Sequence, residues 1–230
     1  MSATYQSVAT GSSTGGNYSI TKPSGTVDGD LLFLVSYQDP DGSPTNQTAS
    51  GFTQVGSTLD NATGSLKLWR KAASGEGASY TIGCDGAAAG IGIMIRINGH
   101  NAASPIDGTA QTSTGAASTS HVAPSVTDVA GSDSLLITGA YGLCSGSAAN
   151  YSALSAGTER ADLQPTTGNW IVGSLGTEAL AASGATGTRT WTCTISRAWN
   201  TFSVAIASAT TTTSMPPPRL MKNFGALLQL

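Results

Sequence analysis

The sequence predicts an all-β protein, a jelly-roll-like antiparallel β-sandwich with an extended C-terminal arm. Short apolar or alternating segments recur along the chain, clusters of Gly, Asp, Asn and Pro separate them, and helical periodicity is nearly absent. The 230 residues are enough for one large sandwich, because all-β domains often exceed about 200 residues.

Two sequence patterns predict the strands. Residues 31–37 and 91–97 are apolar runs, each followed by a turn signal. Residues 52–58 and 65–71 alternate between apolar and polar side chains, as half-buried strands do. Further short strands are expected at 80–82, 134–138, 170–172, 190–195 and 201–206. Prolines 105, 124 and 165 fall in the expected connections, where they do not interrupt a sheet.

A weak internal repeat of strand signals, offset by roughly 105 residues, relates the two halves of the chain. One series of strand signals begins at 28–32 and a similar one at 131–136. The segment 101–120 suits a linker between two small sandwiches or a surface crossover within one. We favour one sandwich over residues 1–208, with halves at about 15–110 and 120–208. Half a sandwich alone would leave the apolar strand at 91–97 poorly covered.

Composition excludes several classes of function. Only 10% of the residues are charged, the net charge is −3 and no block of like charge occurs, so we expect no nucleic-acid partner. No apolar stretch approaches the roughly 18 residues of a membrane span. The residues after Met1 lack the basic and apolar regions of a signal peptide. We therefore expect synthesis in the cytoplasm and no membrane partner.

Cysteine and histidine offer little chemistry. The cysteines are Cys84, Cys144 and Cys193, an odd number that argues against a disulfide scaffold but leaves one bridge open. Cys144 stands between two glycines like the nucleophile of an elbow motif, yet no helix is expected after it. His100 and His121 lie in turn or connection sequences, and we expect both at the surface rather than as metal ligands or bases.

The positions of the carboxylates do not suggest an active-site cleft either. Glu76, Glu159 and Glu178 are expected in or beside turns rather than on strands. The turn sequences 39–42 (DPDG) and 28–30 (DGD) offer carboxylate oxygens to calcium, but the former lacks the full ligand series of an EF-hand loop, and tight turns explain both. We therefore expect a protein that is not an enzyme and that has no catalytic, cofactor-binding or metal-binding residues.

Aromatic residues leave one alternative open. Trp69, Trp170 and Trp191 fall within expected strands, where aromatic rings usually pack in the core. Trp199, between Arg197 and Asn200, is the candidate for an exposed ring and a glycan contact. A carbohydrate-binding adhesion module that recognises a host glycan is therefore an alternative function.

From residue 209 the character of the sequence changes. A run of threonines leads into three prolines, which favour an extended conformation. An apolar end follows, and an isolated apolar tail is unfavourable in water. We therefore expect residues 209–230 to form an arm that docks outside its own sandwich, and the alternative is a strap that lies back across that sandwich. The expected docking residues are Met215, Pro216, Pro217, Pro218, Leu220, Met221, Phe224, Leu227, Leu228 and Leu230.

A series of motifs resembles a β-sandwich family of tailed bacteriophages. Residues 20–32 read ITKPSGTVDGDLL, like the opening of family members. The segments 51–53 (GFT), 69–80 (WRKAASGEGASY), 94–99 (MIRING) and 104–107 (SPID) follow in the family's order. The resemblance covers about residues 15–208, is strongest up to residue 110 and brings no catalytic residues with it.

Family members occur in tails, fibres and head surfaces, so the resemblance implies a structural protein at the virion surface. With the arm, it predicts a capsid decoration (cement) protein whose partners are major capsid or tail proteins. A tail or fibre component is the nearest alternative. Head-vertex and tail positions favour a homo-oligomer, such as a trimer or another ring.

Overall fold

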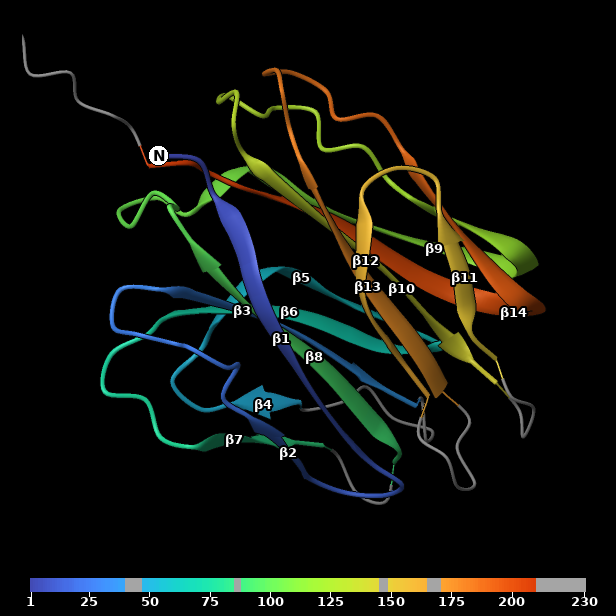
Figure 1. The fold of residues 1–230 in the computed structure, drawn as a ribbon. Coiled ribbons are helices and arrows are strands. Elements are labelled where there is room, and N and C mark those ends of the chain that lie inside the picture. Colours follow the sequence, from blue (N-terminus) through green and yellow to red (C-terminus); the bar gives the residue numbers. More distant parts are fainter. Residues whose placement is uncertain (40–46, 85–87, 145–148, 165–170, 210–230) are drawn as a thin grey trace, which may run out of the picture.

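The computed structural model describes residues 1–39, 47–84, 88–144, 149–164 and 171–209. These residues form antiparallel strands and contain no helix, so the expected all-β fold is confirmed. The strands belong to three sheets, and the two large sheets pack face to face as a sandwich (Figure 1). The jelly-roll topology and the internal repeat stay predictions.

The first large sheet is built from the N-terminal half of the chain. Its strand order is β1-β8-β3-β6-β5. The bounds are β1 (Thr4–Ser13), β3 (Leu31–Gln38), β5 (Thr53–Asn61), β6 (Gly64–Ala72) and β8 (Gly90–Asn98). All eight residues of β3 are buried, because other strands cover both faces of this sheet. A continuous apolar run is the pattern expected of such a doubly covered strand.

The second large sheet is built from the C-terminal half. Its order is β11-β14-β10-β13-β12, and β9 pairs with β14 as well. The bounds are β9 (Ile106–Ala123), β10 (Leu135–Leu143), β11 (Tyr151–Leu154), β12 (Thr158–Leu163), β13 (Ile171–Ala179) and β14 (Arg189–Ile206).

Two expectations about this half are wrong. The segment 101–120 is not a linker or crossover, since most of it lies in β9, which pairs with β14 as a long ribbon. Its many threonines are β-branched and favour strands. The separate strands expected at 190–195 and 201–206 are one strand, β14. Its register with β9 shifts between Thr192 and Arg197, where the ribbon passes from one layer to another.

A small third sheet covers the outer face of the first. It contains β2 (Tyr18–Thr21), β7 (Ser79–Gly83) and β4 (Thr48–Ala49), in the order β2-β7-β4. Ile20 and Ile82 of this sheet pack against Leu34 and Met94 of the large sheet in one buried cluster. The small sheet therefore buries the apolar side chains that β3 and β8 turn away from the sandwich interior.

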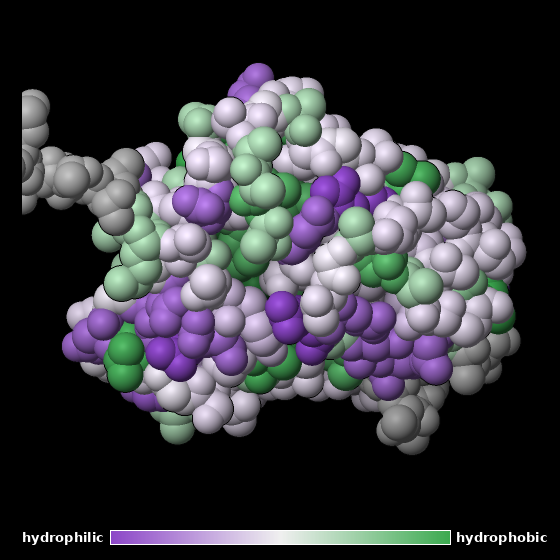
Figure 2. Space-filling model, turned by 45° about the horizontal axis from the view of Figure 1, so that its top comes forward, coloured by the Kyte–Doolittle hydropathy of each residue, from purple (hydrophilic) through white to green (hydrophobic). Residues whose placement is uncertain are grey.

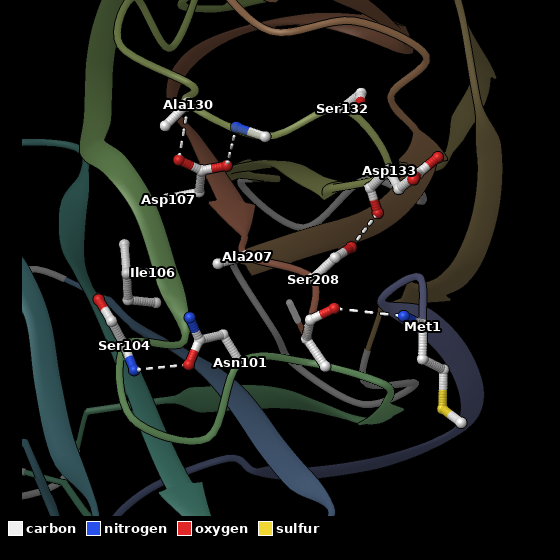
Figure 3. Close-up of a pocket in the computed structure, with 12 residues that line it drawn as sticks. Met1, Asn101, Ser104, Ile106, Asp107, Ala130, Ser132, Asp133, Ala207 and Ser208 are labelled. Atoms are coloured by element: carbon white, nitrogen blue, oxygen red, sulfur yellow. Dashed lines mark hydrogen bonds between the residues drawn. The ribbon is translucent and has the colours of Figure 1, made fainter. Parts of the chain in front are cut away.

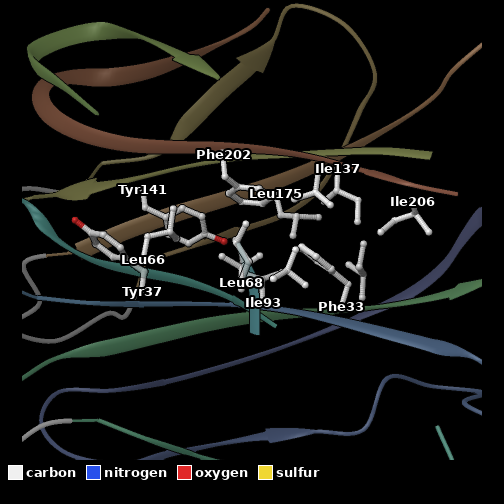
Figure 4. Close-up of a cluster of buried hydrophobic side chains, with 14 of the residues drawn as sticks. Phe33, Tyr37, Leu66, Leu68, Ile93, Ile137, Tyr141, Leu175, Phe202 and Ile206 are labelled. Atoms are coloured by element: carbon white, nitrogen blue, oxygen red, sulfur yellow. The ribbon is translucent and has the colours of Figure 1, made fainter. Parts of the chain in front are cut away.

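The main core lies between the two large sheets (Figure 4). Phe33 and Ile93 enter it from the first sheet, and Ile137 and Phe202 enter it from the second. Each of these side chains is fully buried. A single hydrophobic cluster thus joins the N-terminal and C-terminal halves of the chain.

The second large sheet is covered on its outer face too. There, β11 pairs with the first part of β14, while β10 pairs with the second part. Trp191 and Tyr151 of this outer layer pack against Ala140 and Val172 of the sheet below. The fold therefore has four layers, with the two large sheets in the middle.

Contacts between the two large sheets close both sides of the sandwich. On one side the guanidinium of Arg160 lies 4.1 Å from the ring centroid of Tyr5, which joins β12 to β1. On the other side the Asn61 amide donates to Oδ1 of Asn200 at 2.8 Å, which joins β5 to β14. Such contacts hold edge strands within the fold and limit their pairing with other chains.

Candidate functional site

A pocket of about 540 Å³ lies at the end of the sandwich where Met1 and Ala209 are found. Four segments line it: Met1, the stretch 101–107 that leads into β9, the loop 130–133 before β10, and residues 207–209 after β14 (Figure 3). The pocket thus collects segments from both halves of the chain at the point where the described chain ends.

Asp107 forms one wall of this pocket and is 7% exposed. Its carboxylate accepts hydrogen bonds from the main-chain N–H of Ala130 at 2.8 Å, from that of Gly131 at 3.1 Å and from the Ser134 hydroxyl at 2.6 Å. The ion pairs among the described residues do not include Asp107. Its negative charge is therefore stabilised by dipoles and lacks a cationic partner within the described fold.

The neighbouring loop has an unusual backbone conformation. Asp133 has φ of +72° and is the one residue other than glycine in the described chain with a positive φ. Aspartate tolerates this left-handed region better than most residues. The Asp133 carbonyl accepts a hydrogen bond from the Ser208 hydroxyl, so the loop is tied to the end of the described chain.

The root of the C-terminal arm is held at several points. Ala209 N–H donates to the Gly99 carbonyl at 2.8 Å, and the Met1 amino group donates to the Ala209 carbonyl at 3.2 Å. Ala3 N–H donates to the Ser208 hydroxyl at 2.9 Å. The arm therefore starts from a fixed position beside the pocket. The ten expected docking residues, Met215 to Leu230, lie outside the described residues.

Trp199 does not have the exposed ring that its sequence context predicts. It is 8% exposed, and its ring stacks on His121 with 5.5 Å between centroids. Gly115 on β9 lies against the indole, where a Cβ atom would clash with the ring. The expectation is wrong because β9 crosses beside β14 here and covers the ring.

Both histidines are buried, so the expectation that they lie at the surface is also wrong. His100 is 8% exposed and His121 is fully buried. The ring nitrogens of His121 lie 3.0 Å from the Tyr151 hydroxyl and 2.9 Å from the Ser118 carbonyl. A neutral imidazole satisfies both contacts, with Nε2 donating to the carbonyl and Nδ1 accepting from the hydroxyl. Burial lowers the pKa of His121.

This pKa shift predicts a loss of stability in acid. Since the pKa of His121 is lower in the folded state, the unfolded chain binds a proton first as the pH falls below about 6.5. The free energy of unfolding should then decrease until His121 is protonated in the folded state as well. Asp162 acts in the opposite direction, because burial raises its pKa to about 6 and favours the folded state as the pH falls through that value.

The contribution of His121 is measured with His121→Gln, whose amide can donate to Ser118 and accept from Tyr151. Urea unfolding of both proteins between pH 7.5 and 5 should show a steeper loss in the wild type. Asp162 is present in both, so its effect cancels in the comparison. Parallel pH curves would contradict the role assigned to His121.

The acidic residues have structural partners. Glu159 and Glu178 lie on β12 and β13, so the expectation that they are not on strands is wrong for both, although each lies one residue from the end of its strand, beside a turn. Glu178 forms a two-pronged ion pair with Arg189 at 2.6 and 2.9 Å. Glu76 lies in a loop, as expected, and pairs with Lys71 at 2.7 Å.

The two aspartates of the turn before β3 also have hydrogen-bonding partners within the fold. Asp30 accepts from the Val27 main chain at 2.8 Å and pairs with Arg96 at 2.6 Å. Asp28 accepts from the Gly75 main chain at 2.8 Å. These contacts explain both carboxylates as elements of tight turns.

The three cysteines are unbridged. Cys144 and Cys193 are buried in the outer-layer cluster with Trp191. Burial raises the pKa of Cys144 to about 12, which disfavours the thiolate that a nucleophile requires.

The described part of the chain contains no group of three or more His, Cys, Asp or Glu residues placed to hold a metal ion. Nor does it contain a helix of the length and hydropathy that crossing a membrane requires. Comparison with protein-family models, with curated proteins and with solved structures finds no match.

Sequence reasoning missed Asp107 and Asp133 as pocket residues. Each had a local signal. Asp107 is followed by a glycine, an Asp-Gly pair that is typical of turns, and Asp133 lies in a Gly-Ser-Asp-Ser turn sequence. That they lie at one pocket depends on pairing between β9 and β14, which the sequence did not predict.

Proposed function

We propose that this protein is a non-enzymatic structural component of a bacteriophage virion, a capsid decoration protein that docks on other virion proteins through its C-terminal arm. The observation that carries the proposal is a well-packed body from which the arm starts at a fixed root. The four buried hydrophobic clusters of the described residues lie between Ala3 and Ile206. The described body therefore has a core of its own, and the proposal assigns the apolar residues of the arm sequence to a partner.

The outer surfaces of the body also support this role. Exposed side chains on the small sheet and on the outer layer are almost all hydroxyls: Ser19, Thr21, Thr48, Ser79, Thr81, Ser120, Ser152, Thr192 and Thr194. The face in Figure 2 shows hydrophobic residues interspersed with neutral and hydrophilic ones rather than in one broad patch. A hydrated, hydroxyl-rich surface suits a protein that is displayed on a particle and must not aggregate.

The glycan-binding alternative loses its main support, since the ring of Trp199 is buried. The choice between head and tail is left to the binding experiment.

The experiment compares the full chain with a chain that ends at Ala209. Purified empty heads and purified tails of the phage that encodes the protein are mixed with each form, and bound protein is measured after sedimentation. Removing the arm should weaken binding to heads by at least about tenfold, because each copy loses one of its linked contacts.

Gln54→Ala, a change on the body that leaves the arm intact, serves as the control and should bind like the wild type. Equal binding by the full and shortened chains would refute arm docking. Binding to tails but not to heads would make the protein a tail component.

A further inference from the structure

We infer that the pocket at the chain ends receives the basic, apolar tip of the arm of a second copy of this chain, so that copies are linked by arm exchange. The inference rests on the proposed function in one respect, namely that the arm docks outside its own body. It adds the identity of a receiving site and the residues that form it.

The first argument is charge complementarity. Residues 1–209 contain eight of the ten basic residues and all thirteen acidic residues, so the body carries a formal charge of −5. The arm contains the other two basic residues, Arg219 and Lys222, and no Asp or Glu. An acidic body and a basic arm attract each other, which favours binding of the arm to a body.

The pocket offers groups that match this tip. Asp107 is a buried carboxylate that lacks a cationic partner among the described residues, and Asp133 is an exposed carboxylate on the rim. Ile106, Ala130 and Ala207 add apolar surface to the same lining (Figure 3). A basic side chain flanked by Leu220 and Met221 has the mixed character that such a lining binds.

The Met1 amino group is the cation among the lining residues, and it is engaged with the Ala209 carbonyl. It therefore sits at the root of the chain's own arm rather than beside Asp107, which is bound by the 130–134 loop. The positive charge at Met1 does not replace the partner that Asp107 lacks.

The sequence of the arm favours a second copy over its own pocket. Between Ala209 and Arg219 lie four threonines, one serine, one methionine and three prolines, and consecutive prolines favour an extended chain. Nine residues of extended or polyproline chain span about 28 Å. To return to its own pocket the arm would have to reverse within this stretch, whereas a neighbouring pocket needs no reversal.

Each copy then gives one arm and accepts another. Two copies related by a twofold axis satisfy both sites, and so does a closed ring. The linkage predicts self-association in the absence of any virion particle.

The test uses a chain ending at Ala209, which retains the four buried clusters formed by the described residues, and a synthetic peptide of residues 210–230. Peptide binding is followed by fluorescence anisotropy, and self-association of the full chain by sedimentation velocity across a range of concentrations. We expect the peptide to bind the shortened chain, the full chain to self-associate and the shortened chain to stay monomeric.

Asp133→Asn removes a rim charge but keeps a side chain that tolerates the left-handed backbone. It should weaken peptide binding by about fivefold. Asp60→Asn on β5, an exposed residue far along the sequence from the pocket segments, is the matched control and should have no effect. Replacing both Arg219 and Lys222 with Glu in the peptide should abolish binding.

Three outcomes would overturn the inference. They are no peptide binding, equal weakening by the two Asp→Asn changes, and peptide binding by the shortened chain together with a full chain that stays monomeric, which would mean that the arm occupies its own pocket. These results are separate from head binding. A full chain that binds heads through its arm while the peptide fails to bind the body would leave the proposed function intact.

Discussion

Phe202→Ala is expected to lower the free energy of unfolding by about 3–5 kcal/mol. The Phe202 side chain is fully buried between the two large sheets. Its ring centroid lies 6.3 Å from that of Phe33 in the first sheet and 6.4 Å from that of Tyr141 in its own. Truncation leaves a cavity at the point where the two halves of the chain meet, and neighbours on two hydrogen-bonded sheets cannot collapse to fill it.

Urea unfolding followed by tryptophan fluorescence and by circular dichroism measures this loss. Phe52→Ala, at a partly buried ring that packs edge-on against Tyr80 outside the main core, is the control and should cost clearly less. Both probes should report one shared transition, because the main cluster contains residues of both halves. A loss below about 1 kcal/mol, or separate transitions for the two halves, would contradict the shared core.

The strands with the strongest apolar patterns were predictable from sequence. The segments 31–37 and 91–97 became β3 and β8, the central strands of the first sheet. Both are covered on two faces, so nearly every side chain is buried and the apolar run is continuous. The signal is strong because it reflects burial that every residue of the strand shares.

The long strand β9 was not predictable in the same way. Its residues are mostly Thr, Ser, Ala and Gly, and most of them are at least partly exposed. What holds it is hydrogen bonding to β14, a strand some 80 residues later in the chain. The local composition does not identify such a distant partner. For the same reason the burial of His121 and Trp199 could not be predicted from the sequence.

The strand orders of the two large sheets correspond position by position. The first reads β1-β8-β3-β6-β5, and the second includes β9-β14-β10-β13-β12. The turn before β3 is fixed by Asp30, whereas the turn before β10 is fixed by Ser134 with the carboxylate of Asp107. The internal repeat itself stays a prediction, but it identified two turns that both depend on a buried carboxylate.

Trp199→Ala is expected to lower the free energy of unfolding by about 3 kcal/mol or more. The indole lies between His121 and Gly115, so its removal opens a cavity where β9 crosses β14. Water that enters this cavity should hydrate the imidazole and bring the pKa of His121 back toward its ordinary value. The variant should therefore lose stability less steeply than the wild type between pH 7.5 and 5.

Trp199→Phe is the matched variant, since it keeps an aromatic ring against His121 and should cost markedly less than alanine. Urea unfolding and NMR titration of His121 measure the two effects. If the alanine variant kept the stability of the wild type and instead lost binding to a glycan array, the ring would act at the surface as the sequence suggested. A joint change in stability and in the pKa of His121 would instead establish that Trp199 packs in the outer layer, where its ring supports the crossing of β9 and β14.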